Sequence, residues 1–255
     1  MLESGFSEAL CFDDDVSMLN SKLKIINLKL KWKHTNSFSG YRFACLISSH
    51  HLRSLKYLET LALGWPILHW KFVYDTLRRG KFSYDILPRY LLAAGESLRL
   101  KSSKDSDIMP IFKSHNIFQF YGNLINGSPL SDQIGISSDI MKDFVAILYK
   151  TSGLTSFVGF TLACFGVNRL YCIDSKCTNS EIIKNLSDIL NDCSKQRHRL
   201  LLYSNSTSDG TFDKLLESIQ EGFSENGDFV GADYHVGSKE WLVQTIISGD
   251  TGFDD

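Results

Sequence analysis

The stretch that determines the expected fold is residues 49–79, SHHLRSLKYLETLALGWPILHWKFVYDTLRR. Its apolar residues recur at helical spacing after Ser54, a residue type that often caps helices, and Gly64 provides a stop signal. A short extended segment follows, and a second amphipathic helix ends at Gly80. The apolar positions of that helix lie on one face, and they are 70, 73, 74 and 77. The pattern predicts a helix, a strand and a helix in close succession.

The flanking residues extend this pattern into two cycles of strands and helices. Residues 41–48 (YRFACLIS) form a short apolar run, typical of a buried strand in a parallel sheet. A second cycle has expected strands at 144–149, 169–173, 199–203 and 229–235. Its expected helices run through residue 165 and over 180–191, 213–220 and 238–247. This alternation predicts an α/β fold in two copies. The first copy lacks an initial strand and helix. We expect a fragment that starts late, and the alternative is that the irregular residues 1–40 replace those elements.

Three further segments complete the expected order. In residues 22–33 apolar and polar side chains alternate, which indicates a half-buried strand, although the same run also fits a helix. Residues 101–107 are polar with mixed charge, which is typical of an exposed connector. The apolar and aromatic side chains of residues 111–126 predict a linker helix that braces the two copies.

Composition favours a globular intracellular protein. Hydrophobic residues make up 43% and charged residues 22% of a chain of 255, enough for one large domain or two small ones. The formal net charge is -2, so anion binding requires a local cluster of cations. No apolar stretch reaches the roughly 18 residues of a membrane span. The N-terminus has no signal-peptide pattern, so a cytosolic or nuclear location is expected.

The 6 cysteines include no CxxC pair, and Cys45 and Cys164 lie within apolar runs. We therefore expect reduced core residues rather than a disulfide framework. A zinc site is the alternative for four residues, Cys172, Cys177, Cys193 and His198. Their spacing fits no closed tetrahedral pattern, so no metal and no cofactor are expected.

The residues best suited to bind a ligand are Arg53, Ser54 and Lys56. A cation pair at this spacing on a helix start lies on one face and can share one acidic group. The helix N-terminus adds free N–H groups and a partial positive charge. The cluster favours a phosphate ligand, and the alternative is a solvated helix start. His50 and His51 are expected to be ordinary loop residues, and the alternative is that they titrate near neutral pH and strengthen anion binding in acid.

The run from Arg53 to Tyr57, the Gly64-Trp65-Pro66 turn and the following Trp70 resemble the BRCT repeat, in which such a run ends on a buried Trp. The patterns at 51–97 and 238–253 (SKEWLVQTIISGDTGF) are most similar to the tandem BRCT module of the fungal DNA-damage checkpoint mediator family, the counterpart of the animal p53-binding adaptor. The resemblance implies two repeats, each a small parallel sheet flanked by helices, joined by a helical linker, with the first truncated at its N-terminus.

The resemblance also implies boundaries and residue roles. The expected domains are 1–97 for an incomplete first repeat with an insertion, 98–142 for the linker and 143–255 for the second repeat. In phosphopeptide-binding members of the family, the residue matching Lys56 contacts phosphate, and the one matching Arg53 reads the peptide main chain or terminal carboxylate. The Ser or Thr and the Gly that complete the family's pocket follow a first strand that this chain lacks. Trp70 and Trp241 are expected in the core, and Lys214 on the surface.

The implied function is that of a non-enzymatic nuclear adaptor that binds phosphorylated histone tails at DNA breaks and supports checkpoint kinase activation. Its implied partners are the histone tail, checkpoint kinases and other phosphoproteins, with a homodimer as a further possibility. Neither membrane binding nor direct sequence-specific DNA binding is expected. Two alternatives stay open. One is a BRCT pair that binds partners or dimerises without phosphate. The other is an α/β enzyme, although the chain shows no Gly-rich phosphate loop, nucleophile elbow or paired catalytic carboxylates.

Overall fold

A computed structural model describes most of the expected strands and helices. The described residues are 10–12, 16–20, 23–28, 30–32, 43–96, 139–149, 156–173, 177–178, 180–181, 184–186, 188–189, 199–204, 212–213, 216–217 and 234–253. The connector expected at 101–107 and the linker helix expected at 111–126 lie outside these residues. Within the described part of the chain, no helix is long and apolar enough to cross a membrane.

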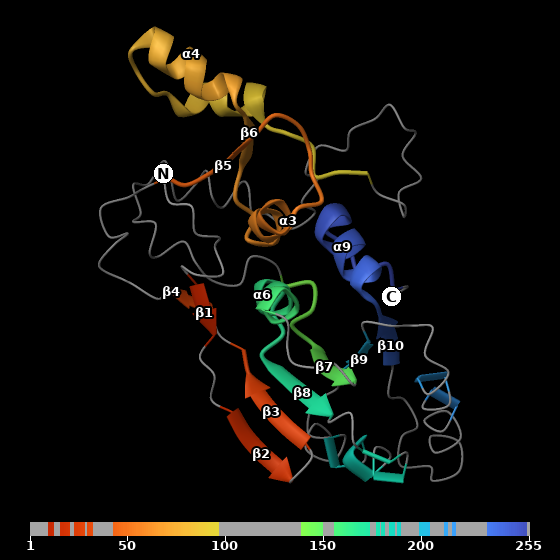
Figure 1. The fold of residues 1–255 in the computed structure, drawn as a ribbon. Helices are drawn as coiled ribbons and strands as arrows, with labels where there is room; N and C mark the ends of the chain where they lie inside the picture. The colour runs from red at the N-terminus through yellow and green to blue at the C-terminus, as the bar shows by residue number, and fades with distance from the viewer. Residues whose placement is uncertain are drawn as a thin grey trace.

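The largest sheet has the strand order β10-β9-β7-β8-β3-β2 (Figure 1). Its parallel strands are β7 (Phe144–Tyr149), β8 (Arg169–Ile173), β9 (Arg199–Tyr203) and β10 (Tyr234–Gly237). The first three coincide with predicted strands, and β10 begins within the last predicted range. Helix α6 (Ser156–Cys164) connects β7 to β8, as a parallel pair requires. The predicted α/β class with a mainly parallel sheet is confirmed.

An antiparallel hairpin from the start of the chain extends this sheet. Strand β3 (Leu23–Asn27) pairs with β8, and β2 (Val16–Asn20) pairs with β3. Beyond them, β1 (Leu10–Phe12) pairs antiparallel with β4 (Leu30–Trp32). The strand expected in 22–33 is therefore present as β3 and β4. The hairpin is hydrogen-bonded to the sheet of the second copy, although it precedes the first copy in sequence.

The first copy contains the elements predicted from residues 49–79. They are β5 (Leu46–Ser48), α3 (Leu55–Ala62), β6 (Ile67–His69) and α4 (Lys71–Arg79). Strands β5 and β6 are parallel, and the 3₁₀-helix η1 (Tyr84–Tyr90) follows α4. Gly64 and Gly80 have φ values of 70° and 69°, so the two helices end at the predicted glycines.

Two clusters of buried side chains lie on opposite faces of the large sheet. Strand β7 is buried throughout and contributes alternate residues to each, Phe144, Ala146 and Leu148 to one and Val145, Ile147 and Tyr149 to the other. The first cluster also contains side chains from α3, α6 and α9 (Lys239–Ser248). Helix α3 contacts both α6 and α9, so it lies where the two copies meet (Figure 1).

The two predicted core tryptophans have different surroundings. Trp241 is partly buried, stacks on Phe253 with ring centroids 5.1 Å apart, and donates from Nε1 to the Thr251 carbonyl at 2.8 Å. Trp70 is 49% exposed, so the prediction that it is a core residue is wrong. The reason is that α4 buries Phe72 instead, which makes edge contacts with neighbouring aromatic rings.

Candidate anion-binding site at the start of helix α3

The three predicted ligand residues lie at the N-terminus of α3, and all are exposed. Ser54 occupies the N-cap position with extended backbone angles, and its side chain makes no capping hydrogen bond. The first turn of α3 contains no acidic residue and instead carries Lys56. The start of α3 therefore combines a positive helix end with the Lys56 cation, and its first turn carries no acidic residue.

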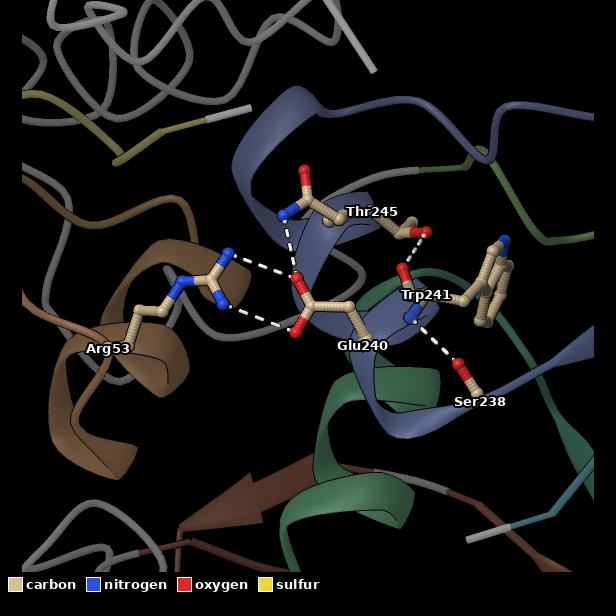
Figure 2. A network of polar contacts seen from close by, with 6 residues as sticks. Arg53, Ser238, Glu240, Trp241 and Thr245 are labelled. Atoms are coloured by element: carbon tan, nitrogen blue, oxygen red, sulfur yellow. Dashed lines mark hydrogen bonds and ion pairs between the residues drawn. The ribbon is translucent and has the colours of Figure 1, made fainter. Parts of the chain in front are cut away.

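Helix α9 of the same chain has a capped N-terminus. Ser238 occupies its N-cap, and the Ser238 hydroxyl accepts a hydrogen bond from the backbone N–H of Trp241 at 3.1 Å (Figure 2). The first turn of α9 also carries Glu240, whose charge is favourable at a helix N-terminus. Both helices follow a serine, but only α9 uses its serine and an acidic residue for capping. The difference leaves the start of α3 suited to an external anion.

The Arg53 guanidinium forms a bidentate pair with the Glu240 carboxylate (Figure 2). The two N–O distances are 3.0 and 3.2 Å, and the side chains of Arg53 and Glu240 are 48% and 51% exposed. Gln244, which is almost fully buried in α9, donates to the same carboxylate at 2.9 Å. Burial acts to raise the pKa of Glu240, but Gln244 and Arg53 together hold it below its ordinary value.

The Arg53–Glu240 pair gives Arg53 a different position from the one predicted for it beside Lys56. Arg53 and Lys56 were expected to share one ligand, whereas Arg53 is engaged with α9 in the structure. Arg53 thus joins the start of α3 to the start of α9 across the contact between the two copies. Lys56 and Ser54 retain the position expected of phosphate ligands, and Arg53 lies at the border between them and the second copy.

Sequence reasoning missed two acidic residues of this region. Glu240 could not be found from spacing, because it lies 187 residues from Arg53. Glu59 was available as a signal, since it is a charged residue among the apolar positions of α3. Its side chain is 0% exposed, and neither carboxylate oxygen has a hydrogen-bonding partner among the described residues. Burial raises the pKa of Glu59 to about 7, and the charge of Lys56 acts in the opposite direction.

Among the described residues, the remaining predicted positions contribute no further ligand set, and Cys193 and His198 lie outside the described part of the chain. His50 lies beside Ser49, with Nδ1 2.7 Å from the serine hydroxyl. Burial raises the pKa of the Cys45 thiol to about 12 and that of Cys172 to about 11, which favours protonated thiols. Lys214 lies outside the described residues. Across the part of the chain that the structure describes, no three His, Cys, Asp or Glu side chains are grouped to hold a metal ion.

No protein-family model matches the chain. A comparison with individual proteins does identify a relative. The chain is 39% identical over 269 residues to the DNA repair protein RAD9 of Saccharomyces cerevisiae. The alignment covers 100% of this chain but 20% of the yeast protein, so the chain spans about a fifth of that relative's length. Among solved structures, the S. pombe Brc1 BRCT5-BRCT6 domains align with a TM-score of 0.44 and 15% identity, covering 81% of this chain and 78% of that one. This chain is therefore similar along its own whole length to a segment of the yeast protein, and this similarity bears out the predicted resemblance to the fungal DNA-damage checkpoint mediator family.

Proposed function

We propose that this chain is a phosphopeptide-binding module of a nuclear DNA-damage checkpoint adaptor. In this proposal it binds a phosphorylated histone tail at DNA breaks and thereby supports checkpoint kinase activation. Its role is binding and not catalysis. Lys56, Ser54 and the first N–H groups of α3 hold the phosphate, and Arg53 reads the adjacent peptide main chain. The division into repeats at 1–97 and 143–255 with a linker at 98–142 belongs to the same proposal.

The observation that supports the proposal most is the start of α3, where exposed Lys56 follows a serine whose side chain makes no capping hydrogen bond. A phosphate group requires a cation, neutral donors and a fixed seat. Lys56 supplies the cation, and Ser54, whose hydroxyl makes no capping bond, supplies a neutral donor. Helix α3 is held between the two copies by its contacts with α6 and α9, so the seat is fixed. Two or three charge-assisted hydrogen bonds, each contributing about 1.5 to 3 kcal/mol, give about 3 to 9 kcal/mol in total, so they support affinities up to roughly micromolar.

The test is a titration of the chain with a histone-tail peptide in serine-phosphorylated and unphosphorylated forms. The phosphorylated form is expected to bind at least tenfold more tightly, and Lys56→Met is expected to remove that preference. Lys71→Met is the matched control, because Lys71 is also an exposed lysine at the start of a helix. Lys71→Met should retain the preference. Equal binding of the two peptides by the unmodified chain would overturn the proposal.

A second candidate function, phosphate-independent association or dimerisation, is favoured by the exposed face of α4. Trp70 at the N-cap of α4 is 49% exposed, and Val73, Tyr74 and Leu77 within the helix are 43%, 59% and 76% exposed. They lie at helical spacing, so they form one apolar stripe on the surface. Leu77→Asp should leave the melting temperature unchanged, because Leu77 is largely solvated already. If this stripe forms a dimer contact, sedimentation will show a dimer that Leu77→Asp converts to a monomer.

A further inference from the structure

The buried carboxyl group of Glu59 lies one helical turn after Lys56 on α3. Positions separated by three residues on a helix are neighbours, with roughly 5 to 6 Å between their Cβ atoms. Glu59 is 0% exposed, whereas Lys56 is exposed at the solvated end of the same helix. The carboxyl group of Glu59 therefore lies in the interior, one turn from Lys56, the residue proposed to bind phosphate. A charge there acts on Lys56 and on any anion that Lys56 binds.

The elements packed against α3 offer little to compensate a negative charge on Glu59. Those elements are α6, α9 and β6. Their titratable residues are Cys164 in α6, His69 in β6, and Lys239 and Glu240 in α9. Neither oxygen of Glu59 has a hydrogen-bonding partner among the described residues. A buried carboxyl group without partners is more stable in its neutral form, and burial raises its pKa to about 7.

We propose that Glu59 is a proton-linked element of the binding site, which takes up a proton when a phosphorylated ligand binds at Lys56. The inference rests on the proposed function. When the ligand is absent, the positive charge of Lys56 favours the ionised form of Glu59. A bound phosphate offsets that charge and adds negative charge near the carboxyl group. The protonated form of Glu59 therefore becomes more favourable when the ligand is bound. By linkage, the same coupling makes the phosphopeptide bind more weakly as the pH rises through neutrality.

The expected effect is moderate. Two negative charges about 10 Å from the carboxyl group, in a medium of intermediate dielectric constant and with salt screening, change the binding constant by about fivefold. Part of any observed pH dependence has other sources, because phosphate loses its second proton near pH 6. Those sources are common to the unmodified chain and to a Glu59 variant. The difference between the two proteins therefore isolates Glu59.

The experiment measures the affinity of the phosphoserine histone-tail peptide between pH 6 and pH 8.5 for the unmodified chain and for Glu59→Gln. The unmodified chain should lose about fivefold more affinity than Glu59→Gln across this range. Calorimetry of the unmodified chain at pH 7.5, in two buffers of different ionisation enthalpy, should show net proton uptake on binding. This second measurement needs no variant. Glu59→Leu provides an alternative neutral side chain if Glu59→Gln does not fold.

The outcomes separate the inference from the function that it rests on. Identical pH profiles for the unmodified chain and Glu59→Gln, together with no net proton uptake by the unmodified chain on binding, would overturn the role of Glu59 and leave phosphopeptide binding in place. Absence of any preference for the phosphorylated peptide, at every pH, would overturn both. Melting temperatures without ligand supply a separate criterion. Glu59→Gln should raise the melting temperature more at pH 8 than at pH 5, and the opposite order contradicts a neutral buried carboxyl group.

Discussion

For the Arg53–Glu240 pair we predict that Arg53→Ala changes the stability of the chain little but lowers its affinity for a phosphopeptide strongly. Both side chains are about half exposed, at 48% and 51%. An ion pair with that solvent access contributes only about 0.2 to 1 kcal/mol, because water and salt screen the charges. We therefore expect Arg53→Ala to lower the free energy of unfolding by less than about 1 kcal/mol. If Arg53 donates a charge-assisted hydrogen bond to bound peptide, the same variant should lose roughly tenfold or more in affinity.

A double-mutant cycle measures how much the interaction between Arg53 and Glu240 contributes to the free energy of unfolding. The free energies of unfolding of the unmodified chain, Arg53→Ala, Glu240→Ala and the double variant are obtained by urea denaturation, at low salt and in 1 M NaCl. The coupling should be about 0.5 kcal/mol at low salt and smaller in 1 M NaCl. Lys239→Ala is the control, since Lys239 is a neighbouring exposed cation on α9. Its cycle with Glu240→Ala should show less coupling.

Two results would refute this reasoning. A coupling of 2 kcal/mol or more, unaffected by salt, would mean that the pair is desolvated and holds the two copies together. An Arg53→Ala variant with normal stability and normal affinity for the phosphopeptide would remove Arg53 from the binding site. A loss of affinity with unchanged stability cannot be attributed to unfolding, so this outcome assigns Arg53 to ligand recognition.

Three further predictions concern stability. The pKa of Glu59 lies above its ordinary value of 4.5, at about 7, so the folded state binds the proton more tightly and stability falls as the pH rises from about 4.5 to 7. Glu59→Gln should remove this loss, which amounts to about 3 kcal/mol, in denaturation curves recorded across that range. Gly237→Ala should be strongly destabilising, because a Cβ there would lie 2.8 Å from Trp241 and 3.0 Å from Leu201, and a melting temperature within a degree of the unmodified value contradicts this. Trp241→Ala should cost about 3 to 5 kcal/mol in urea denaturation, since it removes a stacked ring from the core edge.

The sequence was most informative where burial alone determines an element. Strand β7, FVAILY, is buried on both faces of the sheet, so it appears as a continuous apolar run and could be located to the residue. Strands β8 and β9 were located for the same reason. The ends of α3 and α4 could be predicted because glycine adopts a left-handed conformation readily, as Gly64 and Gly80 do.

Features that depend on distant partners could not be predicted from local pattern. The pairing of β3 with β8 joins residues that are far apart in sequence, and an alternating strand does not specify its partner. Glu240 likewise became part of the site through tertiary contact with Arg53. Helical periodicity correctly placed Trp70 and Leu77 on one face of α4, but periodicity shows which residues share a face and not whether that face is covered.

The position of α3 supports the proposal of a binding site at its start. Its C-terminal part is buried, and α6 and α9 pack against it, so the helix cannot shift without disturbing the main core. Its first residues project to the surface, where Lys56 is exposed and Arg53 reaches α9. A ligand held by both residues therefore contacts a rigid helix end and the border of the second copy together. A phosphopeptide that engages Lys56 and Arg53 should bind the folded chain more tightly than one that engages Lys56 alone, and it should therefore raise the melting temperature more at the same concentration.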